Sequence, residues 1–185
     1  MRTVAILPVK SFGRAKTRLG QAFPDRPALA AAMVADVLDA LGAVPGLDGV
    51  VVVTAEPVAA AGARELGVQL VHDPAETGQS DAVARGIAAT DAERVLLVPG
   101  DCPALDPAEV EALLAHTAPV VIVPDRHGTG TNALLLSPPG VMKPAFGEGS
   151  FARHSALARA AGTEPAVARV RTLGLDVDTP DDLAA

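Results

Sequence analysis

Short apolar runs rich in β-branched residues alternate along the chain with longer stretches rich in alanine and leucine. The short runs predict strands, and several are apolar throughout, as in strands that are covered on both faces. The predicted strands cover residues 3–9, 50–54, 68–72, 94–98, 120–123, 133–136 and 166–170. Strands that alternate with helices form βα units around a mostly parallel sheet. We therefore expect an α/β fold with helices on both faces of the sheet.

The longer stretches predict helices, since residues that favour helix recur in them. Helices are expected over residues 28–41, 57–66, 80–90, 108–116 and 151–161. Asp106, followed by Pro107 and then by Glu109, forms a good helix start signal. A similar signal at Thr179 predicts one more helix. The stretch 137–149 is rich in proline and glycine, and we expect it to be a long surface loop of the kind that is often functional.

Composition limits the class of protein. The chain has 185 residues, of which 49% are hydrophobic and 20% are charged, and its net charge is −7. This length suits one domain over residues 1–185 that buries an apolar core without disulfides. The single cysteine, Cys102, and a short apolar stretch near the start favour a cytoplasmic protein with no export signal or membrane anchor. Aromatic residues make up only 2% of this acidic chain, so nucleic acid is not expected as a partner.

The residues just after each strand are the candidates for chemistry, because open α/β sheets bind ligands at the carboxyl ends of their strands. After the first strand, four of the 15 basic residues fall within residues 10–18, and no acidic residue occurs before Asp25. Positive charge beside a glycine, here Gly13, is typical of a loop that binds a polyphosphate. The alternative is a solvated basic loop that balances an acidic protein. Neither the Walker pattern nor the Rossmann glycine pattern is present.

Carboxylates stand at two further positions. Asp101 follows the predicted strand 94–98, and Asp176 and Asp178 form an i, i+2 pair later in the chain. A hard cation such as Mg²⁺ takes one or two carboxylates and leaves its other positions to water and phosphate oxygens. In an extended segment the i, i+2 pair faces one side, where a cation or an arginine would offset the repulsion. The alternatives are a turn cap at Asp101 and a helix N-cap at Asp178.

Two glycine-rich segments complete the candidate site. Residues 125–132 follow a predicted strand, and residues 146–154 lead into a predicted helix with Ser150 at its start. Free N–H groups at a helix start favour an anion, so each segment is a candidate for a phosphate or carboxylate. The alternative is a plain glycine-rich turn in each case, with Ser150 as an ordinary N-cap. His127 and His154 are expected to be bystanders or anion contacts, because no other histidine or cysteine lies at metal-ligand spacing.

Several motifs occur in an order that resembles a known family. They are Ile6-Leu7-Pro8-Val9-Lys10 with Lys16-Thr17-Arg18-Leu19, Pro99-Gly100-Asp101-Cys102-Pro103, Gly128-Thr129-Gly130-Thr131-Asn132, Phe146-Gly147-Glu148-Gly149-Ser150 and Asp176-Val177-Asp178-Thr179-Pro180-Asp181-Asp182-Leu183. Across nearly the whole chain they resemble the phospholactate or phosphoenolpyruvate guanylyltransferases of coenzyme F(420) biosynthesis. The resemblance implies a GT-A-like nucleotidyltransferase fold. It also implies that GTP and Mg²⁺ are used to guanylylate the phosphate of a three-carbon acid, with release of pyrophosphate.

The resemblance assigns site residues as well. Nucleotide contacts are expected at Lys10, Ser11, Gly13, Arg14, Lys16, Gly78 and Ser80. The metal is expected on Asp101, Asp176 and Asp178, and the phospho-acid on Thr131, Gly147 and Ser150. Lys16 and Asp101 are the expected catalytic residues, with Lys16 and Arg14 stabilising the departing pyrophosphate.

Two rival functions stay open at this point. One is a glycosyltransferase of the same fold, and the other is a GTP-binding domain without catalysis; only a nucleotidyltransferase would release pyrophosphate. Phosphoenolpyruvate is favoured over 2-phospholactate and 3-phosphoglycerate, because an Ala- and Arg-rich, Lys-poor composition suggests a high-GC bacterial genome. A downstream transferase that consumes an unstable product is a further expected partner.

Overall fold

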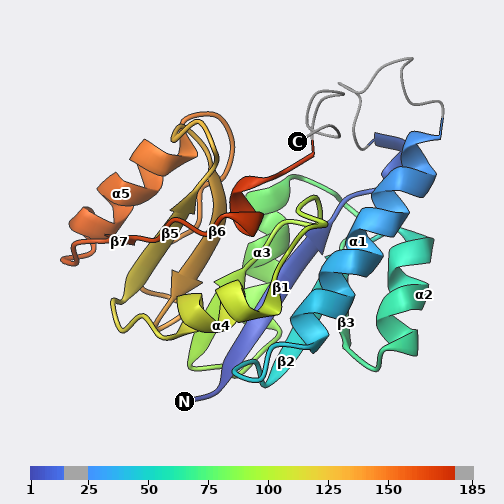
Figure 1. Ribbon diagram of the computed structural model, residues 1–185, viewed down its shortest axis with the longest axis horizontal. Coiled ribbons are helices and arrows are strands. Elements are labelled where there is room, and N and C mark those ends of the chain that lie inside the picture. Colours follow the sequence, from blue (N-terminus) through green and yellow to red (C-terminus); the bar gives the residue numbers. More distant parts are fainter. Residues whose placement is uncertain (15–24, 178–185) are drawn as a thin grey trace.

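The computed structural model describes residues 1–14 and 25–177 of the chain. Within those residues the strands form one seven-stranded sheet in the order β3-β2-β1-β4-β6-β5-β7 (Figure 1). The strands are β1 Thr3–Val9, β2 Gly49–Thr54, β3 Gln69–His72, β4 Arg94–Leu97, β5 Val120–Pro124, β6 Thr131–Leu136 and β7 Ala166–Val167. Neighbouring strands are parallel except at β6, which runs antiparallel to β4 and β5. The mostly parallel sheet expected from the sequence is confirmed, and β6 makes it a mixed sheet.

Helices alternate with the strands as expected, except that β6 follows β5 with no helix between them. They are α1 Arg26–Gly42, α2 Pro57–Glu65, α3 Gln79–Ala88, α4 Pro107–Leu114 and α5 Ser150–Ala160, with 3-10 turns η1 Phe12–Arg14 and η3 Thr172–Gly174. Asp106 caps α4 by accepting a bond from the Ala108 N–H at 2.8 Å, as its start signal predicted. The helix expected near Thr179 lies outside the described residues. None of the helices in the described part of the chain is long and apolar enough to span a membrane.

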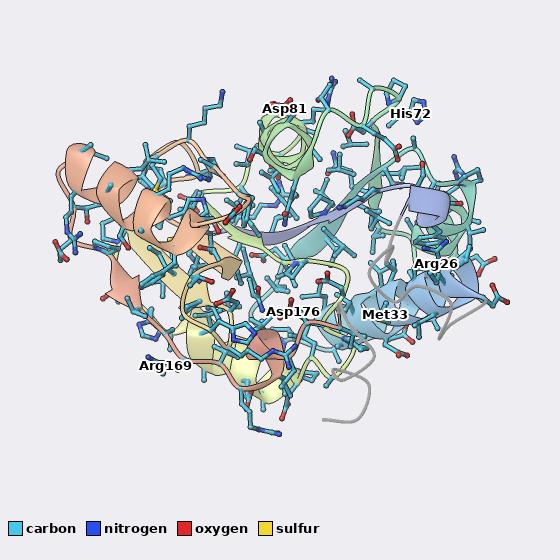
Figure 2. The ribbon with its side chains drawn as sticks, turned by 90° about the horizontal axis from the view of Figure 1, so that it is seen from above. Arg26, Met33, His72, Asp81, Arg169 and Asp176 are labelled. Atoms are coloured by element: carbon cyan, nitrogen blue, oxygen red, sulfur yellow. The ribbon has the colours of Figure 1, made fainter. Side chains whose placement is uncertain are left out.

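An apolar core lies on each face of the sheet, because successive side chains of a strand point to opposite faces. In β1, Ala5 and Leu7 share a core with α1, α2 and α4, whereas Val4 and Ile6 share a core with α3 and α5. The other long strands alternate in the same way, which explains why their sequences are apolar throughout. Figure 2, seen from above, shows α3 and α5 on one side of the sheet and α1 and α4 on the other.

Three local features depart from the sequence prediction. β7 is shorter than the predicted strand 166–170, because Val170 already belongs to a turn in which its carbonyl accepts from the Gly174 N–H at 3.0 Å. Glu109 does not close a capping box with Asp106; its carboxylate instead accepts from the N–H and hydroxyl of Thr172, at 2.9 and 2.7 Å. Residues 137–149 form the expected loop, but it is not wholly at the surface, since Met142 is buried in the core with α3 and α5.

The reversed direction of β6 decides where a site can form. Strands β1, β3 and β4 end at one edge of the sheet, and β6 begins at that edge because it runs against β4. The loops that follow β1, β3 and β4 therefore meet the turn that precedes β6. In this arrangement the glycine-rich segment 125–132 lies next to the loops that carry the basic and acidic candidates.

Candidate active site

A cavity of about 550 Å³ opens at this edge of the sheet. The expected site residues in its wall are Lys10, Gly78, Asp101, Thr131, Gly147, Ser150 and Asp176. The wall also includes residues that the sequence did not single out, among them Phe12, Met33, Asp73, Glu76 and Asn132. Lys16 and Asp178 lie outside the described residues, while Gly13 and Arg14 belong to η1, of which the first residue, Phe12, is in the wall. One cavity thus unites positions that are scattered along the chain.

Asp101 and Asp176 reach the cavity from distant segments that are joined by backbone hydrogen bonding. The Val177 N–H donates to the Asp101 carbonyl oxygen at 3.0 Å, which ties this late segment to the loop after β4. Asn132, in β6, donates from Nδ2 to Asp176 Oδ1 at 3.2 Å. Asp176 lies near the centre of the view in Figure 2, with Met33 of α1 also labelled there. Asn132 was not predicted as a site residue, although it is adjacent to Thr131 in the glycine-rich motif.

The described acidic residues suit a cation that shares its coordination with a ligand. Asp101 and Asp176 both line the cavity and offer carboxylate oxygens, the donors that Mg²⁺ and similar hard cations prefer. Among residues 1–14 and 25–177, no group of three or more His, Cys, Asp or Glu side chains could hold a metal by itself. Such a pair fits an open site that phosphate oxygens complete, and it does not form a closed protein cage. The part expected of Asp178 stays a prediction.

The loop after β1 points its backbone donors at carboxylate oxygens. The N–H and the hydroxyl of Ser11 both donate to Glu76 Oε1 at 2.6 Å, and the Phe12 N–H donates to Glu56 Oε2 at 2.9 Å. Converging donors of this kind are what an anion such as phosphate requires. A nucleotide phosphate that used the Ser11 donors would have to displace Glu76.

The start of α3 forms a different end of the cavity. Gly78, at φ 136°, is the N-cap of α3 and lines the cavity with Asp73 and Glu76. Asp73 is only 4% exposed, and its Oδ1 lies 3.2 Å from Arg85 Nε but makes no hydrogen bond within the described structure. The two carboxylates here have different partners: Asp73 is paired with Arg85, whereas Glu76 joins the start of α3 to Ser11 in the loop after β1.

Ser80, an expected nucleotide contact, bonds to another part of the site. Its hydroxyl accepts a hydrogen bond from the Phe146 N–H at 2.9 Å. Asp81, its neighbour in α3, is exposed and points away from the sheet in Figure 2. Ser80 therefore connects α3 to the loop that precedes α5, and its expected role toward the nucleotide stays a prediction.

The loop before α5 is held by the first turn of that helix. The Arg153 guanidinium donates to the carbonyl oxygens of Ala145 at 2.8 Å and Glu148 at 2.7 Å. Ser150 is the first residue of α5 and is 2% exposed, and the N-cap position belongs to Gly149, whose φ is 67°. The alternative in which Ser150 is an ordinary N-cap is therefore wrong, because a left-handed glycine takes that position.

His154 is buried beneath the cavity wall and bonds to two segments of the site. It is 0% exposed, its Nε2 accepts from the Ala145 N–H at 2.9 Å, and its Nδ1 lies 3.0 Å from Thr131 Oγ1. Burial, with a smaller contribution from the charge of Arg153, lowers the pKa of His154 from 6.5 to about 4. The sequence did offer a signal, since His154 stands four residues after Ser150 and therefore lies on the same helix face.

The segment 125–130 is a turn that satisfies its own donors. The Asp125 carboxylate accepts from the N–H of Thr129 at 2.9 Å and of Gly130 at 2.9 Å. Burial raises the pKa of Asp125, but these bonds outweigh it and hold the pKa below its usual value. A Cβ at Gly130 would lie 2.7 Å from Asp125 Oδ2, so a larger residue there would push the Asp125 carboxylate out of this arrangement. Residues 125–130 thus form a glycine-rich turn, as the alternative interpretation of this segment expected. Thr131, which follows the turn, lines the cavity.

Comparison with known families gives one match over nearly the whole chain. The sequence model of the family described as "Guanylyl transferase CofC like" matches residues 3–185. A protein of Conexibacter woesei named phosphoenolpyruvate guanylyltransferase is 53% identical over 100% of this chain and 87% of its own length. A protein of the same name from Sphaerobacter thermophilus is 37% identical over 99% of this chain and 91% of its own length.

Solved structures share the fold at much lower identity. A putative nucleotide-diphospho-sugar transferase from Desulfovibrio desulfuricans is similar with a TM-score of 0.74, at 18% identity, over 99% of this chain and 85% of its own. A nucleotidyl transferase from Methanothermobacter is similar with a TM-score of 0.68, at 19% identity, over 99% of this chain and 94% of its own. Glucosyl-3-phosphoglycerate synthase from Mycobacterium tuberculosis is similar with a TM-score of 0.63, at 15% identity, over 91% of this chain and 68% of its own. That structure was solved with Mn²⁺, UDP and phosphoglyceric acid. The expected GT-A-like nucleotidyltransferase fold is confirmed.

Proposed function

The chain belongs to the family of CofC-like guanylyl transferases, and from this premise we propose that it transfers GMP from GTP to the phosphate of phosphoenolpyruvate and releases pyrophosphate. The single observation that carries the proposal is the cavity that Asp101 and Asp176 share with Thr131, Gly147 and Ser150. An acidic cation site and an anion site in one cavity suit a reaction between two phosphorylated substrates. The relatives named phosphoenolpyruvate guanylyltransferase favour that acid over 2-phospholactate and 3-phosphoglycerate.

The chemistry requires alignment more than proton transfer. A phosphate monoester carries negative charge near neutral pH, so its oxygen can attack the α-phosphorus of GTP without a general base. One P–O bond forms between the acid's phosphate and the α-phosphorus, while the bond to the β-phosphate oxygen breaks and pyrophosphate leaves. Holding the two substrates in line and neutralising their charge is then the main task of the site.

Asp101 and Asp176 would hold a divalent cation, and we propose Mg²⁺, with Asp178 as a third ligand. The paired carboxylates fit a hard cation that keeps positions open for phosphate oxygens. A cation bound there supplies positive charge at the reacting phosphates and so lowers the barrier to attack. Asn132 serves this arrangement by bonding Asp176 Oδ1 at 3.2 Å, which limits the directions that the carboxylate can take.

The nucleotide would lie between the loop after β1 and the start of α3. Lys10 lines the cavity, and the N–H and hydroxyl of Ser11 already converge on one anionic oxygen, Glu76 Oε1. We assign the triphosphate to Lys10, Ser11, Gly13, Arg14 and Lys16, with Lys16 as the residue that stabilises the departing pyrophosphate. Gly78, which lines the cavity at the start of α3, would allow close approach of the base, with Ser80 beside it.

The phospho-acid would lie against β6 and the first turn of α5. Thr131 and Ser150, which carry hydroxyl groups, are in the cavity wall, and so is Gly147, at φ 115°, which has no side chain to block its backbone. The N-terminus of α5 adds a favourable field for a carboxylate or phosphate. The small size of these residues suits a three-carbon acid.

The test is pyrophosphate release by the purified protein with Mg²⁺ and GTP, adding phosphoenolpyruvate, 2-phospholactate or 3-phosphoglycerate in turn. Release with phosphoenolpyruvate and a guanylylated product in the mass spectrum would support the proposal. Release with another acid would correct the substrate, and transfer from a nucleotide sugar without pyrophosphate would support the glycosyltransferase alternative.

A product anhydride of this type is reactive, so we propose a cytoplasmic downstream transferase as the partner that consumes it. If GTP binds but pyrophosphate is not released, adding that transferase separates product inhibition from a non-catalytic GTP-binding domain. Pyrophosphate release that begins only when the transferase is added would indicate product inhibition. If no pyrophosphate is released even then, the protein would be a non-catalytic GTP-binding domain.

A further inference from the structure

His154 joins the two segments that bear the expected phospho-acid contacts. It lies in α5 and is fully buried, and each of its ring nitrogens lies within hydrogen-bond distance of one segment. Nε2 accepts from the Ala145 N–H at 2.9 Å, in the loop that leads to Gly147. Nδ1 lies 3.0 Å from the hydroxyl oxygen of Thr131, at the start of β6. The Phe146 ring packs edge-on against the imidazole, with centroids 5.1 Å apart.

The proton on the ring can be assigned from these partners. A backbone N–H is a donor only, so Nε2 must offer its lone pair to Ala145 and cannot carry a proton. In a neutral imidazole the single proton is then on Nδ1. Nδ1–H therefore donates to Thr131 Oγ1, and the lowered pKa of His154 agrees with a neutral ring at neutral pH.

The assignment fixes the direction in which Thr131 donates. Its oxygen accepts from His154, so its own proton must go to another acceptor. Thr131 is 7% exposed and lines the cavity, where an anionic substrate offers acceptors and no donors. We propose that His154 is a positioning residue that orients the Thr131 hydroxyl as a hydrogen-bond donor to the phospho-acid. This inference rests on the proposed function, because it takes the acid as the ligand at this part of the cavity.

Two substitutions separate the two ends of the ring. In His154→Asn the amide nitrogen stands near the position of Nδ1 and can still donate to Thr131, while the acceptor for Ala145 is lost. In His154→Gln the amide oxygen can reach the position of Nε2 and accept from Ala145, while the donor to Thr131 is lost. His116→Gln, at an exposed histidine beyond α4, is the matched control.

The expected result is a selective loss for the acid. A hydrogen bond to a charged group is worth enough that His154→Gln should raise the phosphoenolpyruvate KM about 10- to 100-fold, with the GTP KM unchanged. His154→Asn should raise it by less than about a third of that factor, and His116→Gln should not change it. Equal rises in both KM values for His154→Gln would overturn the inference, because general loosening of the site would explain them.

Coupling to Thr131 gives the decisive measurement. Thr131→Val removes the hydroxyl and keeps the shape, so it should raise the phosphoenolpyruvate KM as His154→Gln does, while Thr131→Ser should retain most of the affinity. If His154 acts through that hydroxyl, the double variant should be no worse than Thr131→Val alone. Multiplying effects would overturn the inference.

Folding and function can be kept apart in these experiments. Should His154→Gln fail to fold, the comparison of His154→Asn with Thr131→Val and Thr131→Ser still decides, since loss of acid affinity in His154→Asn equal to that in Thr131→Val would contradict the assignment. Calorimetric titration of wild type with phosphoenolpyruvate separates the two proposals. Wild type that binds the acid but transfers nothing would defeat the proposed function, and the same titration on the variants would still test His154.

Discussion

Replacing Asp101 with asparagine keeps the shape of the side chain but removes its charge. We expect Asp101→Asn to lower the turnover number at least about 100-fold, because a weakened cation site leaves the charge of the reacting phosphates less neutralised. The thermal midpoint should change little, since the residue contributes its backbone carbonyl to the Val177 bond and that bond is retained. Pyrophosphate release checks activity and far-ultraviolet circular dichroism checks folding. Asp81→Asn, on the outward face of α3, is the matched control, and normal turnover in Asp101→Asn would contradict the metal assignment.

Ser150 tests the acid side of the cavity with the loss of one hydroxyl. Ser150→Ala should raise the phosphoenolpyruvate KM about tenfold and leave the GTP KM unchanged, because a hydrogen bond to an anion is lost. Steady-state kinetics with each substrate varied in turn gives the two values. A rise confined to the GTP KM would mean that the two substrates bind the other way round.

The buried ring of His154 makes stability depend on pH. The unfolded chain takes up a proton near pH 6.5, whereas the folded protein resists it until about pH 4. The contribution of His154 to the free energy of unfolding is therefore complete above pH 6.5. It is lost as the pH falls from 6.5 to about 4, by about 3 kcal/mol in total. Urea unfolding at several pH values, followed by circular dichroism, measures it. The His154→Gln variant should lose less over the same window, and an identical slope would refute the effect.

Among the elements, α3 packs unusually close to the sheet at Gly86. A Cβ there would lie 2.5 Å from Ile6 Cγ2 and 3.0 Å from Val53 Cγ2. Gly86→Ala should therefore lower the free energy of unfolding by about 1–3 kcal/mol despite the better helix propensity of alanine. Gly62→Ala, in α2 with no atom within 4 Å of the added Cβ, should instead raise it by about 0.5–1 kcal/mol. Urea unfolding of both variants checks the pair, and a stable Gly86→Ala would show that α3 can shift outward.

The elements themselves could be predicted from the sequence because most are long runs with a clear pattern. β1 is found at its predicted bounds, and both faces of the sheet are covered as the apolar strands indicated. The antiparallel direction of β6 was not assigned from the sequence, although a signal was present: the nine residues between the predicted strands 120–123 and 133–136 contain no predicted helix and are too few for a parallel crossover. The short β7 was overestimated because its length depends on the turn at Val170.

At the scale of the whole molecule, the candidate site was predictable in part for a topological reason. Lys10 and Asp101 follow parallel strands, and such positions meet at one edge of a sheet. Asn132 and His154 were missed as site residues because their roles exist only through partners in other segments: Asp176 for Asn132, and Thr131 with Ala145 for His154. A sequence shows a residue type and its spacing, but not which distant group it will face.

The hydrogen bond between Val177 and Asp101 also has a consequence during synthesis. Asp176 is translated 75 residues after Asp101, which corresponds to roughly 4–15 seconds at ordinary rates. By the start of that interval the loop after β1, β4 and Asp101 have been translated, while the second carboxylate has not been made. A nascent chain can therefore build most of its sheet before it can assemble the acidic pair. If that pair is needed for turnover, the growing polypeptide has no activity until all the strands that the structure describes have been translated.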